Sequence, residues 1–282
     1  MFKLMWRLIK TIISISIIIV ILGSIGFAYA RFIEPDRLNV TEISDISYSI
    51  HEPVTVAIFA DTHFGFDYTT DDFQNVIDVI NKKSPDFILF AGDLIDYLDK
   101  YEGDTALISQ KLSELNADAG KYAVFGNHDY GGGAENKYEE IMNAGGFTVL
   151  KNEIVTYEKK NFRIIGIDDI LIGYGNPDIA NKADAAMYNL VLCHEPDVID
   201  EIENSNTDIF VAGHTHGGQI RIPHYTEMFL PSYGRTYVKG KYQLNNPCQT
   251  IVYVNPGLGT TKLPARLGSV PEITFITINP CK

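Results

Sequence analysis

The sequence is poor in cysteine and in basic charge. Three cysteines among 282 residues are too few for a disulfide framework, although Cys248 and Cys281 stay a candidate pair in an oxidising compartment. Lysine and arginine number 23, against 36 aspartates and glutamates. Proteins that bind a nucleic-acid backbone usually carry a basic excess, so this balance argues against nucleic acid as the main partner.

Charged residues are absent from one long stretch near the N-terminus. Residues 11–30 contain no charged side chain, and twenty helical residues span about 30 Å, the thickness of a bilayer's hydrocarbon core. A buried core helix is the alternative, but such a helix is rarely apolar on every face. We therefore predict a transmembrane helix over 11–30, preceded by a short N-terminus at 1–10.

The charges around this stretch predict its orientation. Lys3, Arg7 and Lys10 precede it, and no acidic residue occurs before Glu34. Positive charge stays on the cytoplasmic side, so residues 1–10 are expected in the cytoplasm and everything after the helix outside it. This makes the chain a single-pass membrane protein with an extracytoplasmic domain.

A cleaved signal peptide is the alternative to a retained anchor. The stretch ends in Ala28-Tyr29-Ala30, which fits a signal-peptidase site, and cleavage there would give a secreted protein. In both cases the exported part loses three basic residues, which leaves 20 of the 23 against 36 acidic residues and a net charge of −16.

Short apolar runs alternate with helix-like stretches in the rest of the chain. Residues 31–52 are predicted to form a linker and an initial strand, and residues 53–282, with no repeat or second linker, a single domain. Strands are expected at 54–60, 86–92, 121–126, three times within 147–168, and at 188–193, 208–213, 250–255 and 272–279, and helices at 71–82, up to about 116, and at 134–144. This order predicts an α/β fold, a layered sandwich of two mixed β-sheets flanked by helices.

Polar side chains stand directly after five of these predicted strands. Ligands of open α/β sheets bind at the carboxyl ends of the strands. The groups are Asp61-Thr62-His63, Gly92-Asp93, Gly126-Asn127-His128-Asp129, His194 and Gly213-His214-Thr215-His216, which hold five of the seven histidines. One such group alone is usually a turn or a helix cap, but five in this order predict a metal site. Imidazole combined with oxygen ligands suits Mn, Fe or Zn.

The ordered pattern D-x-H, G-D, G-N-H-D, H, G-H-x-H resembles that of the calcineurin-like metallophosphoesterases, from about residue 54 to the C-terminus. The stretches GHTHGGQIRIP, LPSYGRTYVKGKY and VNPGLGTTKLPARLGSVPEIT are similar to the membrane-associated YkuE/YaeI/LpxG-type branch of that family. The resemblance implies a two-sheet sandwich, a centre of two divalent metal ions, and hydrolysis of a phosphoester.

The resemblance also implies a role for individual residues. Asp61, His63 and His216 would hold the first ion, Asn127, His194 and His214 the second, and Asp93 would bridge both. His128 would protonate the leaving oxygen, and Asp96 would orient His128. Candidates for contacts with the substrate are Arg221, Arg235 and Arg266, for which solvated surface charge is the alternative.

The expected activity is hydrolysis of a phosphodiester, pyrophosphate or phosphomonoester, with a lipid- or envelope-linked substrate favoured by the membrane helix. Protein phosphatases of the family place an arginine after the Asp-x-x-Asp motif, where this chain has Tyr97, so a phosphoprotein substrate is disfavoured. A non-catalytic scaffold and a nuclease are the alternatives. Every position of the metal-ligand pattern carries a ligand-type residue, which disfavours the scaffold, and the acidic net charge disfavours the nuclease.

The orientation of the helix can be tested with a reporter fused after residue 282. Because the basic residues precede the apolar stretch, alkaline phosphatase, which works only outside the cytoplasm, is expected to be active in this fusion. Green fluorescent protein exported by the same route is expected to stay dark. The opposite pair of results would overturn the predicted topology.

Overall fold

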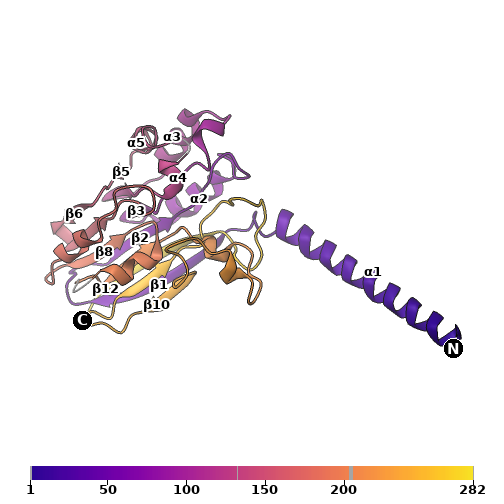
Figure 1. The fold of residues 1–282 in the computed structure, drawn as a ribbon. Coiled ribbons are helices and arrows are strands. Elements are labelled where there is room, and N and C mark those ends of the chain that lie inside the picture. The colour runs from indigo at the N-terminus through magenta and orange to yellow at the C-terminus, as the bar shows by residue number, and fades with distance from the viewer. Residues whose placement is uncertain (1, 132, 203–205, 282) are drawn as a thin grey trace.

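The protein consists of a long N-terminal helix and a layered α/β domain (Figure 1). The computed structural model describes residues 2–131, 133–202 and 206–281. Two six-stranded sheets form the domain, with strand orders β1-β12-β2-β3-β4-β5 and β10-β11-β9-β8-β7-β6. Both sheets contain parallel and antiparallel pairs. The predicted fold class, two mixed sheets flanked by helices, is confirmed.

The elements follow one another along the chain in the predicted alternation. The first sheet is formed by β1 (Asn39–Ser47), β2 (Val54–Phe59), β3 (Phe87–Phe90), β4 (Gly120–Ala123), β5 (Thr148–Val149) and β12 (Glu272–Pro280). The second is formed by β6 (Glu153–Tyr157), β7 (Phe162–Gly166), β8 (Tyr188–Leu192), β9 (Ile209–Ala212), β10 (Gly240–Gln243) and β11 (Ile251–Val254). The α-helices are α1 (Phe2–Phe32), α2 (Phe73–Lys83), α3 (Thr105–Ser113), α4 (Asn127–Tyr130) and α5 (Tyr138–Ala144).

Side-chain alternation along β2 explains how the layers stack. Val56 and Ile58 pack in a core that includes Leu190 of β8, between the two sheets. Ala57 and Phe59, which point the other way, pack in a core shared with α2, α3 and α5. Because both faces of the strand are covered, its residues from Val56 to Phe59 are all apolar, and not only those at alternate positions.

Two short elements are absent from the sequence-based prediction. The helix α4 carries the Gly-Asn-His-Asp motif, and β10 pairs antiparallel with β11 at the edge of the second sheet. Each contains four residues, which is too short for a helical or strand period to emerge in the hydrophobic pattern.

Residues 33–38 join α1 to β1, and hydrogen bonds hold the end of the helix against the domain. Among the described residues it is the one helix long and apolar enough to cross a membrane, which makes it a candidate anchor or signal sequence. Ala30, near its end, is its one buried residue. The backbone N–H of Arg266 donates to the carbonyl of Ala30 at 2.9 Å, and that of Ser269 donates to the Glu34 carboxylate at 2.7 Å. The end of the helix is thereby bound to a loop of the domain.

Lys121 on β4 connects the sheet to two helices. Its ammonium donates to the carbonyls of Leu112, Leu115 and Gly145, at 2.9, 3.0 and 2.7 Å. These carbonyls lie at or just beyond the C-terminal ends of α3 and α5, where the regular i+4 donors of a continuing helix are missing. Burial lowers the pKa of Lys121 to about 8, but the three acceptors favour the protonated form.

We expect Lys121→Met to lower the free energy of unfolding by about 2 kcal/mol, since it leaves three partly buried carbonyls without their charged donor. Urea unfolding of the detergent-solubilised protein measures this change. Lys137→Met is the matched control, because the Lys137 side chain is 55% exposed and, among the described residues, its ammonium pairs with Glu140 at the surface. If Lys137→Met lowered the free energy of unfolding as much as Lys121→Met does, the proposed role of Lys121 would be contradicted.

Candidate metal centre

The polar groups predicted from the sequence meet at one edge of the two sheets. β2, β3 and β4 run parallel in the first sheet, and β8 and β9 run parallel in the second. Their carboxyl ends therefore point the same way within each sheet, and the loops that follow them carry the candidate ligands. These are Asp61, His63, Asp93, Asn127, His194, His214 and His216.

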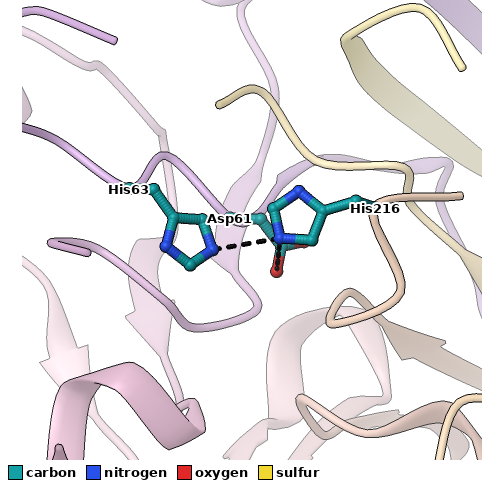
Figure 2. A group of neighbouring side chains, drawn as sticks. All are labelled: Asp61, His63 and His216. Carbon is teal, nitrogen blue, oxygen red and sulfur yellow. Dashed lines mark hydrogen bonds and ion pairs between the residues drawn. The ribbon is translucent and has the colours of Figure 1, made fainter. Parts of the chain in front are cut away.

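The first group of side chains lies between the loops after β2 and β9 (Figure 2). The Nε2 atoms of His63 and His216 face each other at 3.0 Å, and Asp61 Oδ1 lies 3.8 Å from His216 Nε2. Residues 153 positions apart thus point into one small space. Their ligand-type atoms all lie within 4.8 Å of one another.

The second group lies beside the first and shares Asp93 with it. His194 Nε2 and His214 Nδ1 are 3.1 Å apart. Asp93 Oδ2 lies 3.2 Å from His194 Nε2 and 3.4 Å from His63 Nε2, so one carboxylate oxygen faces both groups. Asn127, whose amide the sequence assigned to this group, lines the same cavity as Asp93 and His214.

The protonation of the histidines fits cation binding. In three of the four candidate ligand histidines, the other ring nitrogen contacts an acceptor: Ala91 O at 2.6 Å for His194, Ser232 O at 2.9 Å for His214, and Asp96 Oδ1 at 3.1 Å for His63. An N–H on the outer nitrogen leaves the lone pair of the inner nitrogen for a metal ion.

Burial favours the neutral form of three of these imidazoles. It lowers the pKa of His63 and of His216, and it lowers the pKa of His214 to about 4. Burial acts in the same direction on His194, but the carboxylate of Asp93 outweighs it and raises the pKa of that residue. Imidazoles whose nitrogens gather around carboxylates form a donor set suited to Mn, Fe or Zn.

Two polar atoms of the site are buried without a hydrogen-bond partner among the described residues, Asn127 Oδ1 and His216 Nδ1. Leaving such an atom unpaired costs about 1–3 kcal/mol. A cation at the second group would give the amide oxygen of Asn127 a partner. The residues present therefore fit a pair of divalent ions.

The backbone of the ligand loops is strained. Asp61, His63, Asp93, His214 and His216 all have positive φ, between 43° and 70°. Non-glycine residues rarely adopt this region, and such strain gathers at functional sites because the surrounding fold enforces it.

The glycines of the motifs are required by close packing. A Cβ at Gly126 would lie 2.3 Å from Asp93 Oδ1, and one at Gly213 would lie 2.7 Å from Asp61 Oδ2. Any larger residue would push these carboxylates out of the site. The glycine that precedes the ligands in these two motifs is therefore part of the site's geometry.

Asp129 belongs to the site although the sequence gave it no role. Its buried carboxylate accepts from the backbone N–H groups of Asp93, Leu94 and Gly126, at 2.7, 2.9 and 2.9 Å. It therefore fastens the end of β3 to the end of β4 and fixes the position of Asp93. The sequence feature that could have identified Asp129 is its position as the last residue of the Gly-Asn-His-Asp motif.

His128 lies at the mouth of the site beside both groups. Its backbone N–H donates to Asp93 Oδ1 at 2.9 Å, and its ring centroid is 4.7 Å from that of His63. Its Nδ1 lies 2.6 Å from the carbonyl of Asp96 and 3.4 Å from the Asp96 carboxylate. The carboxylate is nearer to His63 Nδ1 and also accepts from the Thr261 hydroxyl at 3.0 Å. Asp96 therefore contacts both histidines, and holds His128 chiefly through its backbone.

A cavity of about 310 Å³ extends from these residues. Its floor includes Asp93, Asn127 and His128, and its walls come from residues 218–231 and 261–263. Lys262 is the one lysine or arginine among the described residues that line it. The three arginines expected to contact substrate are not among the lining residues.

The prediction that Arg266 contacts the substrate is wrong, because this side chain stabilises the fold. It is fully buried, and its guanidinium donates to the backbone carbonyls of Pro256, Gly259 and Ser269. All of its nitrogens are occupied, which leaves none for a substrate. Arg221 contacts the carbonyl of Gly217 at 3.3 Å, and Arg235 meets Asp197 through its backbone N–H. For these two, substrate contact stays a prediction.

Comparisons with known proteins agree with this geometry. Residues 54–218 match the family model described as calcineurin-like phosphoesterase. The chain is 37% identical to the uncharacterized metallophosphoesterase YkuE of Bacillus subtilis, with 90% of each chain covered. It is 29% identical to the phosphodiesterase YaeI of Escherichia coli, with 90% of this chain and 93% of that one covered.

Solved structures support the fold. The structure of the NAD nucleotidase NadN of Haemophilus influenzae superposes with a TM-score of 0.51 at 15% identity. It covers 74% of this chain, which spans 46% of that one. At this identity the likeness concerns the fold alone.

We expect the purified protein to hold close to two transition-metal ions per chain after reconstitution. Asp93→Ala should lower this content, because the Asp93 carboxylate faces both groups. His128→Ala should keep its metals and lose activity by about 10²-fold or more, the range typical of a lost general acid. Elemental analysis by mass spectrometry measures the metals. Loss of metal from His128→Ala would show that this histidine is a ligand.

Proposed function

The chain belongs to the calcineurin-like phosphoesterase family of metal-dependent phosphoester hydrolases, and we propose that it cleaves a phosphodiester or pyrophosphate of a lipid- or envelope-linked substrate with two divalent ions. A phosphomonoester is the less favoured substrate. The observation that carries the proposal is the position of Asp93 Oδ2, 3.4 Å from His63 Nε2 and 3.2 Å from His194 Nε2. One carboxylate between two histidine groups is suited to holding two ions side by side.

Seven residues would hold the ions. Asp61, His63 and His216 would hold the first, Asn127, His194 and His214 the second, and Asp93 both. Two such ions, when bound, acidify a water and neutralise phosphate oxygens. The residues themselves fix the geometry: their strained backbone and buried hydrogen bonds hold the donor atoms in place before the substrate arrives.

His128 is proposed to deliver a proton to the leaving oxygen. Its Nδ1 is occupied by the carbonyl of Asp96, so Nε2 is the nitrogen that faces a substrate in the cavity. Its backbone N–H, bonded to Asp93 Oδ1, keeps it beside the phosphate position. Asp96 is a positioning residue for His128 and for His63 alike.

The charge of the cavity favours a substrate with one negative charge per phosphorus. A monoester dianion needs cationic contacts beyond the two ions, and Lys262 is the single lysine or arginine among the described lining residues. Tyr97, which stands where protein phosphatases have arginine, packs its ring 5.5 Å from that of His128. A diester needs no further cation.

We also propose that α1 anchors the domain outside the cytoplasm. The basic residues before the apolar stretch and the direct junction between α1 and the domain support a retained anchor. An anchored enzyme meets lipid-borne substrates at a high local concentration without a basic surface to recruit them.

We expect kcat/KM for bis-p-nitrophenyl phosphate to exceed that for p-nitrophenyl phosphate by roughly tenfold at matched Mn²⁺, about 1.4 kcal/mol in transition-state stabilisation. Tyr97→Arg should raise the relative rate on the monoester, since it supplies the missing cation, and Tyr97→Phe should leave the ratio unchanged. A clear preference of the unmodified enzyme for the monoester would overturn the proposed substrate class.

A further inference from the structure

Large apolar side chains gather on the outer wall of the cavity. Residues 220–231 and Leu263 form what we name the apolar lip. Its exposed members are Ile222, Tyr225, Met228, Phe229 and Leu263, with 46%, 61%, 73%, 79% and 58% of their surface exposed. All of them except Met228 line the cavity, so they are neighbours in space. A cluster of this kind, unlike a single exposed leucine, marks a surface that contacts another apolar phase.

The two loops of the lip are fastened to each other. The side-chain amide of Gln219 donates to the carbonyls of Thr261 and Leu263, at 3.0 and 2.8 Å. The backbone N–H of Leu267 donates to Gln219 O at 2.9 Å, and that of Arg221 donates to Leu267 O at 2.7 Å. The lip is thus held as one unit.

The same unit is fastened to the end of α1. The backbone N–H groups of Arg266 and Ser269, which follow Leu263 in the chain, donate to Ala30 O and to the Glu34 carboxylate. Arg31 adds an ion pair with Asp67 at 2.9 Å. Figure 1 shows α1 leaving the domain at one end, while the C-terminus lies at the opposite end. The lip therefore lies on the side of the domain from which α1 departs.

The point at which the uncharged stretch ends limits the distance between the lip and a membrane. The uncharged stretch ends at Ala30, and Ala30 is already buried against the domain. No residues remain to act as a spacer between the bilayer and the Arg266 loop. With α1 as the anchor, the lip meets the surface of the bilayer that α1 crosses.

The charges beside the lip suit a membrane surface. Residues 219–240 and 256–271 contain Arg221, Arg235, Lys239 and Lys262, besides the buried Arg266, and a single acidic residue, Glu227. The whole chain, in contrast, has a net charge of −13. Anionic headgroups repel most of this domain but attract the region around the lip.

We propose that the apolar lip is a membrane-docking surface that inserts into the outer leaflet of the bilayer spanned by α1. The mouth of the cavity then opens at the lipid surface, and Ile220, Ile222 and Phe229 form an apolar path from the bilayer to the candidate metal centre. The substrate class that fits is an amphiphile whose phosphodiester reaches Asp93 while its acyl chains stay against the lip. This substrate assignment rests on the proposed hydrolase function, whereas the docking itself does not.

Docking is tested with the full chain in vesicles of phosphatidylethanolamine and phosphatidylglycerol. Trp6 is the only tryptophan, so a Trp6→Phe background accepts single reporters. Phe229→Trp reports on the lip. Tyr48→Trp is the control, because Tyr48 is 87% exposed just after β1, whose nine residues place it about 30 Å from the α1 junction.

Lipids brominated on their acyl chains quench a tryptophan that enters the bilayer. We expect them to quench Phe229→Trp several-fold more than Tyr48→Trp. Equal, weak quenching of the two reporters would overturn the docking surface, whatever the enzyme hydrolyses.

The substrate class is tested with two diesters that share a leaving group, bis-p-nitrophenyl phosphate in solution and phosphatidyl-p-nitrophenol in vesicles. Met228→Asp should slow cleavage of the lipid diester several-fold and leave the soluble diester unchanged. Tyr48→Asp, which adds the same charge at the far end, should affect neither. An unchanged lipid-to-soluble ratio in Met228→Asp would overturn the amphiphile assignment. If the unmodified protein cleaves neither diester, the proposed phosphodiesterase activity fails while the quenching result stands.

Discussion

The gathering of seven polar ligand-type side chains, six of them buried, at the shared edge of two sheets is the constraint on which the rest of the structure depends. Imidazoles and carboxylates taken out of water without a partner are costly, and here His63 faces His216 and His194 faces His214, nitrogen to nitrogen. The fold tolerates this arrangement because Asp93 lies between the pairs and because divalent cations suit the donors. Two bound divalent ions would offset this cost, so metal binding is expected to stabilise the folded edge.

The rigidity of the edge comes from hydrogen bonds between buried carboxylates and the backbone. Asp129 joins the ends of β3 and β4 through three backbone N–H groups, and the backbone N–H of His214 is held by the Asp61 carboxylate at 3.0 Å. These bonds cross between segments that are far apart in the chain, so the donor atoms are positioned before any ligand arrives. Preorganisation of this kind is what a charged transition state requires.

Backbone hydrogen bonds also connect the wall of the cavity to the end of α1. Arg266 is buried at the centre of a loop whose carbonyls it holds, and that loop bonds to the end of α1 on one side and to the Gln219 segment on the other. The hydrogen bonds that close the cavity wall therefore also hold the domain against the end of α1.

The sequence by itself determined the order of elements, the apolar N-terminal helix, the family and the residue types at the strand ends, because periodicity and short motifs are local. Gly-His-Thr-His alone could not show that His216 faces His63 and His214 faces His194. That choice depends on how two sheets stack, and the contacts join residues up to 153 positions apart. Tertiary structure likewise decided that Arg266 is an internal brace and that Ile222, Phe229 and Leu263 meet in one lip, since burial and clustering are properties of the packed chain and of no single segment.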